Sequence, residues 1–200
     1  MSAAARHSAT EVVRDDDPRR EALEAAGWTV VATSFGAELT AHGADVVRLR
    51  GLVGAVAPLE VRPLDEGDVE AVLDLDARTA EDYPGGPATA HTPLTRSTAS
   101  ARGARRSFGA FDDGVLVAMT IVDRDGDVVE TDRTVVAPSH RRRGLASAVK
   151  AASVLAMLDD GARRFRTGGS ADNTGILAAS ARSGYVVDER WLTYAAPDVG

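Results

Sequence analysis

The chain has 200 residues, of which 30 are acidic and 23 basic, so its formal net charge is −7, and it contains no cysteine. This length predicts a single domain whose core needs no cross-links. The lack of cysteine excludes disulfides, thiolate metal ligands and cysteine nucleophiles, and the acidic balance argues against a nucleic-acid binder that depends on counterion release.

Nothing in the sequence predicts export or a membrane span. The N-terminus lacks the apolar stretch of a secretory signal, and the best apolar run, Val115–Val122, is only as long as a strand. The four histidines are scattered without the spacing of metal ligands. We therefore expect a cytoplasmic protein with no bound metal, no membrane partner and no nucleic-acid partner.

The N-terminal quarter carries weak signals. Residues 1–14 are predicted to be a disordered tail because they are small and polar and show no periodicity. A helix is predicted to start with Asp17 as its N-cap and to stop at Gly27, and Trp28–Phe35 is predicted to be a strand. The apolar stretch Arg48–Val56 is broken by glycines and fits neither period.

From residue 58 onward, the pattern alternates clearly between strands and helices. Strands are predicted at 59–64, 108–111, 115–123, 128–136, 163–167 and 185–194. Helices are predicted after a cap at Asp65 or Asp68, at 145–156 and at 173–182, and residues 80–95 are predicted to be a loop. This order predicts an α+β fold, with a mixed, mostly antiparallel central sheet flanked by helices.

One internal similarity bears on domain organisation. Ala25–Val31 and Arg182–Val187 both read as a helix end, a glycine, an aromatic residue and a β-branched run. Any helix-glycine-strand junction looks like this, but the similarity also fits a second interpretation, in which residues 15–57 are the C-terminal remnant of a second half-domain of the same kind. The predicted organisation is a tail, an extension over 15–57 and one domain over 58–196.

The strongest chemical signal is the segment from Val135 to Ala146, where a strand runs through a basic loop into a helix. The first amide groups of a helix have no intrahelical partner, and the helix dipole adds positive charge there. Gly144 allows close approach, whereas three consecutive arginines at the positive end of a dipole are unfavourable unless an anion binds. The segment therefore predicts a pyrophosphate site. The patterns of P-loops and of dinucleotide-binding loops are absent.

These residues resemble a known family. Arg141-x-x-Gly144-x-Ala146 after a strand that ends in Val-x-Pro is similar to the acetyl-CoA signature of the GNAT superfamily of N-acetyltransferases, and the resemblance extends over about residues 59–195. It implies a GNAT-like acyl-CoA N-acyltransferase fold. It also implies an enzyme that transfers acetyl from acetyl-CoA, its co-substrate, to a primary amine by direct attack, without a covalent enzyme intermediate.

The resemblance also implies where the coenzyme binds. Strand 128–136 would pair with the pantetheine arm, the loop and first helical turn would hold the pyrophosphate, and a splay between strands 128–136 and 163–167 would open a slot for the thioester. The implied coenzyme-binding residues are Thr134, Val135, Val136, Arg141, Arg142, Arg143, Gly144, Leu145, Ala146, Ser147 and Asn173.

Acetyl transfer to an amine needs a base, because an ammonium group has no lone pair. Glu130 occupies the position of the catalytic glutamate in related transferases, and Asp132, two residues further on the same strand, is the reserve candidate. Both would otherwise be solvent-facing strand residues. Ser180 stands where many relatives carry a tyrosine that protonates the leaving thiolate, and a serine hydroxyl is a poor acid. Tyr185 and Tyr194 are alternatives for that role or core aromatic residues.

The acceptor is not readable from the sequence. We expect a small-molecule or peptide amine, and Glu81, Asp82 and Tyr83 either hold a cationic amine or lie in a solvated loop. A homodimer is possible. The loss of the tyrosine at Ser180 and the possible half-domain also fit an alternative from another class, a catalytically silent acyl-CoA-binding or sensor protein with a degenerate active site.

Overall fold

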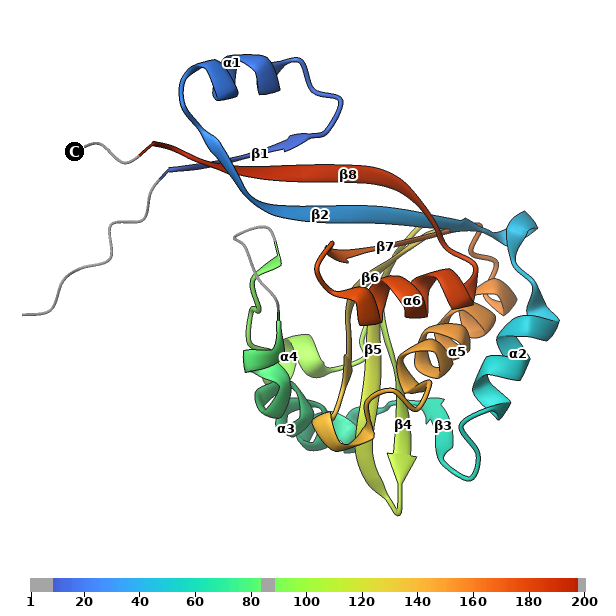
Figure 1. Ribbon diagram of the computed structural model, residues 1–200. Coiled ribbons are helices and arrows are strands. Elements are labelled where there is room, and N and C mark those ends of the chain that lie inside the picture. The colour runs from blue at the N-terminus through green and yellow to red at the C-terminus, as the bar shows by residue number, and fades with distance from the viewer. Residues whose placement is uncertain (1–8, 84–88, 198–200) are drawn as a thin grey trace, which may run out of the picture.

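The computed structural model describes residues 9–83 and 89–197, and its elements are shown in Figure 1. In this part of the chain, eight strands form one sheet in the order β1-β8-β2-β7-β6-β5-β4-β3. The strands are β1 (Thr10–Arg14), β2 (Thr29–Thr40), β3 (Glu60–Pro63), β4 (Arg105–Asp112), β5 (Val115–Asp125), β6 (Val128–Val136), β7 (Arg164–Ser170) and β8 (Val186–Ala195). The helices are α1 (Arg19–Ala25), α2 (Val46–Gly54), α3 (Val69–Thr79), α4 (Arg96–Ala99), α5 (Leu145–Asp159) and α6 (Thr174–Ser183), with short 3-10 turns η1 (Ala41–Gly43), η2 (Glu66–Asp68), η3 (Ala80–Asp82) and η5 (Pro138–His140).

The predicted fold class is confirmed. Neighbouring strands pair antiparallel except β6 and β7, which run parallel. Helix α5 packs against β3–β6 and against α2 and α6, whereas α3 packs against β5 and β6 and against α4. None of the helices in the described residues is long and apolar enough to cross a membrane.

The N-terminal predictions need correction. The tail predicted over residues 1–14 is wrong at its end, because Thr10–Arg14 form β1, which pairs with β8 and leaves Val13 0% exposed. Residues 1–8 lie outside the described residues. The N-cap of α1 is Pro18 rather than Asp17, although the Asp17 carboxylate still accepts a hydrogen bond from the Arg19 amide. Strand pairing to a distant segment, which local polarity does not reveal, orders this region.

Two other segments can now be assigned to elements that the sequence did not predict. The stretch that fitted neither period is helix α2, capped by the Asp45 side chain, which accepts from the Arg48 amide at 3.0 Å. The predicted loop over residues 80–95 contains η3, and its residues 84–88 lie outside the described residues.

Helix α5 is buried over more of its circumference than one apolar face predicts. The face predicted to be buried included Ala152, Leu155 and Ala156, which are only partly buried. By contrast, Lys150 and Ser153 are buried. The sheet covers one side of α5 while α2 and α6 cover another, so polar positions of this helix lie in the interior.

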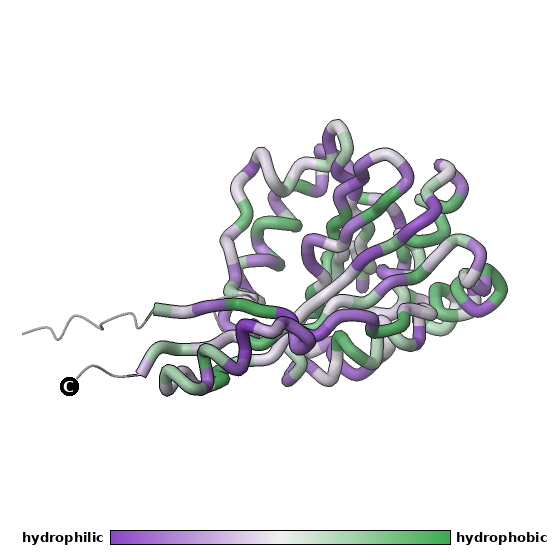
Figure 2. Tube along the Cα trace, turned by 90° about the horizontal axis from the view of Figure 1, so that it is seen from above, coloured by the Kyte–Doolittle hydropathy of each residue, from purple (hydrophilic) through white to green (hydrophobic). Residues whose placement is uncertain are grey.

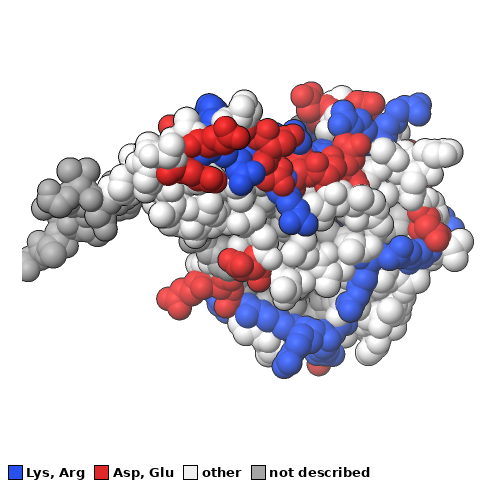
Figure 3. All heavy atoms as spheres, turned by 45° about the horizontal axis from the view of Figure 1, so that its top comes forward, with Lys and Arg blue, Asp and Glu red and all other residues white. Residues whose placement is uncertain are grey.

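Strands β1, β8 and β2 form an arm that carries α1 and projects from the body of the molecule (Figure 1). Seen from above, the arm bears hydrophobic residues among hydrophilic ones (Figure 2), and Val12, Val30 and Val31 are 40%, 46% and 55% exposed. Figure 3 shows acidic side chains with interspersed arginines over the same part of the molecule. Helix α1 buries none of its residues.

The arm contains an internal two-fold relationship. The unit β1-α1-β2 has the same order as β7-α6-β8, and β2 and β8 lie side by side between β1 and β7. A glycine with positive φ follows each helix, Gly27 at 80° and Gly184 at 97°. In the pairing of β2 with β8, one residue on each strand has no partner and forms a bulge, Val31 on β2 and Asp188 on β8. Each bulge lies four residues after the glycine that follows the preceding helix. The two units thus share order, turn and bulge position.

Gly109 on β4 lies against the side chains of Leu64 and Leu116, with no room for a side chain of its own. A Cβ atom there would lie 2.5 Å from Leu116 Cδ1 and 2.6 Å from Leu64 Cδ2, so we expect Gly109→Ala to lower the free energy of unfolding by about 1–3 kcal/mol. Gly51→Ala in α2, where nothing lies within 4 Å, should instead raise it by about 0.5–1 kcal/mol. Urea unfolding measures both, and equal stability of Gly109→Ala and the unmodified protein would contradict the packing.

Candidate functional site

A cleft opens where the parallel strands β6 and β7 separate. Their pairing ends at Glu130 and Arg166, so the later residues of β6 have a free edge toward β7. The cleft has a volume of about 570 Å³. It is lined by Thr79, Asp82, Tyr83, Thr134, Val135, Val136, His140, Arg141, Arg142, Gly144, Leu145, Ala146, Ser147, Asp172, Asn173, Thr174, Gly175, Ile176, Ala178, Ala179 and Arg182.

The loop between β6 and α5 presents a row of amide groups to this cleft. Arg142 and Gly144 have positive φ angles of 61° and 85°, and Gly144 is the N-cap of α5. Among the described residues, the amides of Arg142, Arg143 and Gly144 donate to no backbone acceptor. The first amides of α5 are free by helix geometry. Such a concave run of amide groups at a helix N-terminus suits a diphosphate.

Arginine side chains surround the loop in different environments. Arg141 donates to the carboxylate of Asp82 across the cleft and, at 3.3 Å, to the Val136 carbonyl. Arg182, on α6, also lines the cleft. A coenzyme phosphate near Arg141 would therefore compete with Asp82 for the same guanidinium group.

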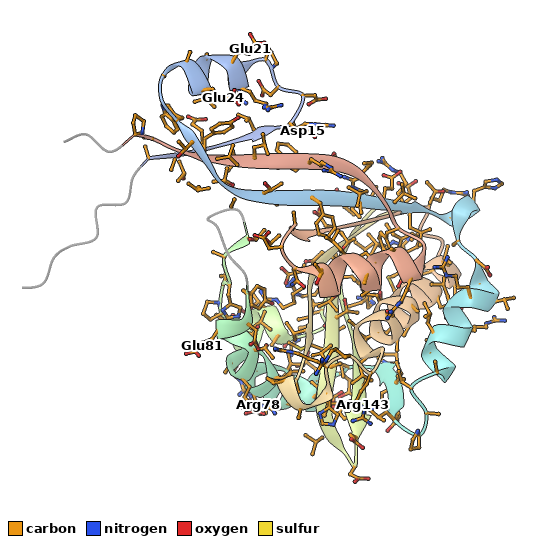
Figure 4. All side chains as sticks on the ribbon, in the orientation of Figure 1. Asp15, Glu21, Glu24, Arg78, Glu81 and Arg143 are labelled. Atoms are coloured by element: carbon orange, nitrogen blue, oxygen red, sulfur yellow. The ribbon has the colours of Figure 1, made fainter. Side chains whose placement is uncertain are left out.

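Of the residues that the sequence implied for the coenzyme, all but Arg143 line the cleft. Arg143 turns away, and its guanidinium lies 4.0 Å from the carboxylate of Asp112, at the end of β4. Figure 4 shows its position at the lower end of the molecule. Asn173 caps α6, since its Oδ1 accepts from the Ile176 amide at 3.1 Å.

The predicted catalytic residues do not line the cleft. Glu130 is exposed, and it forms the last pair between β6 and β7 with Arg166. Asp132 is an extra residue in β6, opposite the Ile121–Val122 step, and its carboxylate accepts from Arg105 and, at 3.3 Å, from Arg133. Ser180 is buried, and its Oγ has no hydrogen-bond partner in the described structure.

Neither tyrosine named as an alternative acid reaches the cleft. Tyr185 is buried, and burial raises the pKa of its phenol. Tyr194 is also buried and donates to Glu24 at 2.7 Å, in the arm. Tyr83, by contrast, lines the cleft, and burial raises the pKa of its phenol to about 12.

A buried polar cluster fixes the wall that carries Tyr83. The Asp76 carboxylate, on α3, accepts from Arg133 at 2.6 Å, from the Leu94 amide at 2.9 Å and contacts His91 at 3.0 Å. The ring of His91 in turn lies 4.8 Å from that of Tyr83. Sequence patterns missed this cluster because its members lie on α3, on β6 and in the predicted loop.

The arrangement can hold an elongated ligand with an anionic end. The amide row accommodates a diphosphate, and the free edge of β6 offers hydrogen bonds to an extended arm laid along it as an additional strand. In the described residues, no group of three or more histidine and acidic side chains is placed to hold a metal ion.

Comparisons with known proteins agree with this geometry. A family model described as the acetyltransferase (GNAT) family matches residues 70–185. No curated protein matches the chain. A GCN5-related N-acetyltransferase from Sphaerobacter thermophilus has a TM-score of 0.72 at 15% identity over 98% of this chain and 63% of its own. A tandem GNAT protein from the clavulanic acid biosynthesis pathway has a TM-score of 0.66 at 22% identity over 96% of this chain and 65% of its own.

A shorter solved protein is similar over less of the chain. The ribosomal-protein-S18-alanine N-acetyltransferase from Escherichia coli has a TM-score of 0.53 at 17% identity, over 71% of this chain and 96% of its own. At these identities, the solved structures show the fold. The present chain spans less than two thirds of the length of the Sphaerobacter protein and of the tandem protein.

Proposed function

Because the chain belongs to the GNAT acetyltransferase family, we propose that it transfers an acetyl group from acetyl-CoA to a primary amine of a small molecule or peptide, in the cytoplasm. The observation that carries this proposal is the cleft itself, which joins the free edge of β6 to the amide row before α5. The diphosphate would bind the amides from Arg142 to Ser147, and the pantetheine arm would lie along Thr134–Val136.

Direct attack needs the acceptor nitrogen without its extra proton. We keep Glu130 as the base, because its carboxylate is exposed, has no ion pair in the described residues and lies where β6 and β7 part. It would act through a bridging water, since it does not line the cleft. Asp132 is a weaker candidate because two arginines hold its carboxylate. The acceptor nitrogen loses a proton as the amide forms, and the departing thiolate gains one.

Coenzyme A release from acetyl-CoA with a panel of primary amines tests the activity. We expect Glu130→Gln to lower turnover by about 100-fold, within the usual range for a general base, with unchanged acetyl-CoA affinity. Glu21→Gln, on the projecting helix α1 (Figure 4), is the matched control and should match the unmodified protein. Unchanged turnover in Glu130→Gln would contradict its role as the base.

A silent acyl-CoA-binding or sensor protein is the second candidate. It is favoured by the placement of Glu130, Asp132 and Ser180 outside the cleft lining. Tight acetyl-CoA binding without turnover on any amine would support it, whereas turnover with one amine would exclude it.

We also propose that the extension over residues 15–57 derives from a second half-domain. The order, glycine and bulge position that α1-β2 shares with α6-β8 support this origin, and β1, which directly precedes residue 15, stands where β7 stands in the second unit. Superposition on a solved tandem relative tests it. The last helix and strand of the relative's first domain should fall on α1 and β2, and any other element at that place would contradict it.

A further inference from the structure

Lys150 stands out in the composition and in the interior. It is the only lysine of the chain, in which every other basic residue is arginine. It is also 1% exposed, on the second turn of α5. Arginine stays charged in proteins, whereas a lysine can lose its proton and enter the interior as a neutral amine. The single lysine of this chain thus occupies a buried position where an arginine would have to stay charged.

The amine of Lys150 lies at the point where the slot begins. Its Nζ donates to Thr167 Oγ1 at 2.9 Å on β7 and, at 3.4 Å, to Thr131 Oγ1 on β6. Thr131 and Thr167 are the first residues beyond the last paired residues, Glu130 and Arg166. Lys150 thus bridges the two strands where their backbone pairing stops.

Within residues 9–83 and 89–197, no carboxylate forms an ion pair with this amine. Besides the two threonines, Nζ lies 5.1 Å from the ring centroid of Tyr185. Burial alone lowers the pKa of Lys150, to about 7, with no contribution from a nearby charge. Burying an amine without a carboxylate costs free energy, and replacing buried charged groups by apolar side chains of similar volume is often neutral or stabilising. Groups that break packing rules in this way are concentrated at functional sites.

The direction of β6 connects this bridge to the ligand. A coenzyme arm that starts at the amide row and follows β6 past Val136 and Thr134 runs toward Thr131. Its far end, the thioester, would then lie beyond Thr134, the last β6 residue in the cleft lining, and toward the point where β6 and β7 part. The inference rests on the proposed function, because only an acyl-coenzyme A ligand places a reacting group there.

We propose that Lys150 is a positioning residue for acyl transfer. Its amine, hydrogen-bonded to Thr131 and Thr167, sets the distance between β6 and β7 where their pairing ends, and thereby the position at which the thioester binds. It acts through the two strands and does not touch the pyrophosphate. Its loss should therefore weaken binding of the pantetheine arm and leave binding of the nucleotide end unchanged.

Calorimetric titration of the full chain with two probes tests this assignment. The probes are acetyl-CoA and the nucleotide half of coenzyme A, a phosphorylated ADP without the pantetheine arm. For Lys150→Met, we expect acetyl-CoA affinity to fall about tenfold, because a changed strand separation costs the pantetheine arm about one hydrogen bond to β6. Affinity for the nucleotide half should stay unchanged, and the melting temperature should not fall.

Two further variants keep the test decisive. Thr167→Val retains the lysine and removes its nearer hydrogen-bond partner. It should likewise bind acetyl-CoA more weakly and the nucleotide half normally, and it replaces Lys150→Met if that variant does not fold. Ser153→Ala removes another buried polar group of α5, whose Oγ donates to the Lys150 carbonyl at 2.8 Å, and should bind both probes normally. A purely structural role would lower the melting temperature and the affinity for both probes together.

The outcomes separate the two proposals. If the unmodified protein binds neither probe, the proposed function fails and the role of Lys150 fails with it. If the unmodified protein binds acetyl-CoA and Lys150→Met binds it equally well, or loses both probes alike, the proposed function stands and the role of Lys150 is overturned.

Discussion

Gly144→Val is expected to reduce acetyl-CoA affinity by about 100-fold or more. The residue has a φ of 85° at the N-cap of α5, where a β-branched residue is strained. Relief of that strain rotates the peptide groups of Arg143 and Gly144 out of the amide row. A diphosphate bound by several oriented amide groups loses most of its contacts when the row is broken. Calorimetric titration with acetyl-CoA measures the loss.

Gly161→Val is the matched control. Gly161 also has a φ of 85°, follows the opposite end of the same helix and has nothing within 4 Å of an added Cβ. Both substitutions force a left-handed residue and should lower the free energy of unfolding by similar amounts, about 1–2 kcal/mol. Only Gly144→Val should lose the coenzyme. Equal affinities of the two variants would show that the loop before α5 does not bind the diphosphate.

This loop was predictable because its information is local. Strand, arginines, glycine and helix follow one another within a dozen residues, and the amide row is a consequence of backbone geometry at a helix start. The side-chain direction of Arg143 was not predictable in the same way. Its position beside Asp112 depends on where the β4–β5 turn lies, which consecutive residues do not encode.

The arm shows the opposite case. The sequence predicted a strand from Trp28 and noticed the similarity to the segment after Gly184, but it did not predict that β2 runs to Thr40 between β7 and β8. Insertion into a sheet depends on partners more than a hundred residues away. Polarity around Thr10 likewise suggested a tail, and only the neighbouring β8 makes that segment a strand.

The catalytic assignments were limited by the same cause. Glu130 and Asp132 were placed by their position relative to Arg141 along one strand. The register with β5 leaves Asp132 as an unpaired extra residue, and Arg105 and Arg133 hold its carboxylate. Lys150 was overlooked because a lysine on a helix usually faces water, and here both sides of α5 are covered.

The second prediction with a large effect concerns how the free energy of unfolding depends on pH. Burial lowers the pKa of Lys150 in the folded protein from its ordinary value of 10.5 to about 7. Between these two values, the unfolded chain carries a proton that the folded protein lacks, so raising the pH favours the folded state. We therefore expect the free energy of unfolding of the unmodified protein to rise from pH 7 to pH 10 relative to that of Lys150→Met. The difference in slope should approach about 1.4 kcal/mol per pH unit.

Urea unfolding at several pH values measures the two curves. They should diverge only in this interval, since Lys150 is protonated in both states at lower pH and neutral in both at higher pH. Other groups titrate in both proteins and cancel in the difference, and the neighbouring Tyr185 stays protonated because burial raises its pKa. Ser153→Ala, which retains the lysine, should follow the unmodified protein. Parallel curves for the unmodified protein and Lys150→Met would mean that the amine remains charged in the interior.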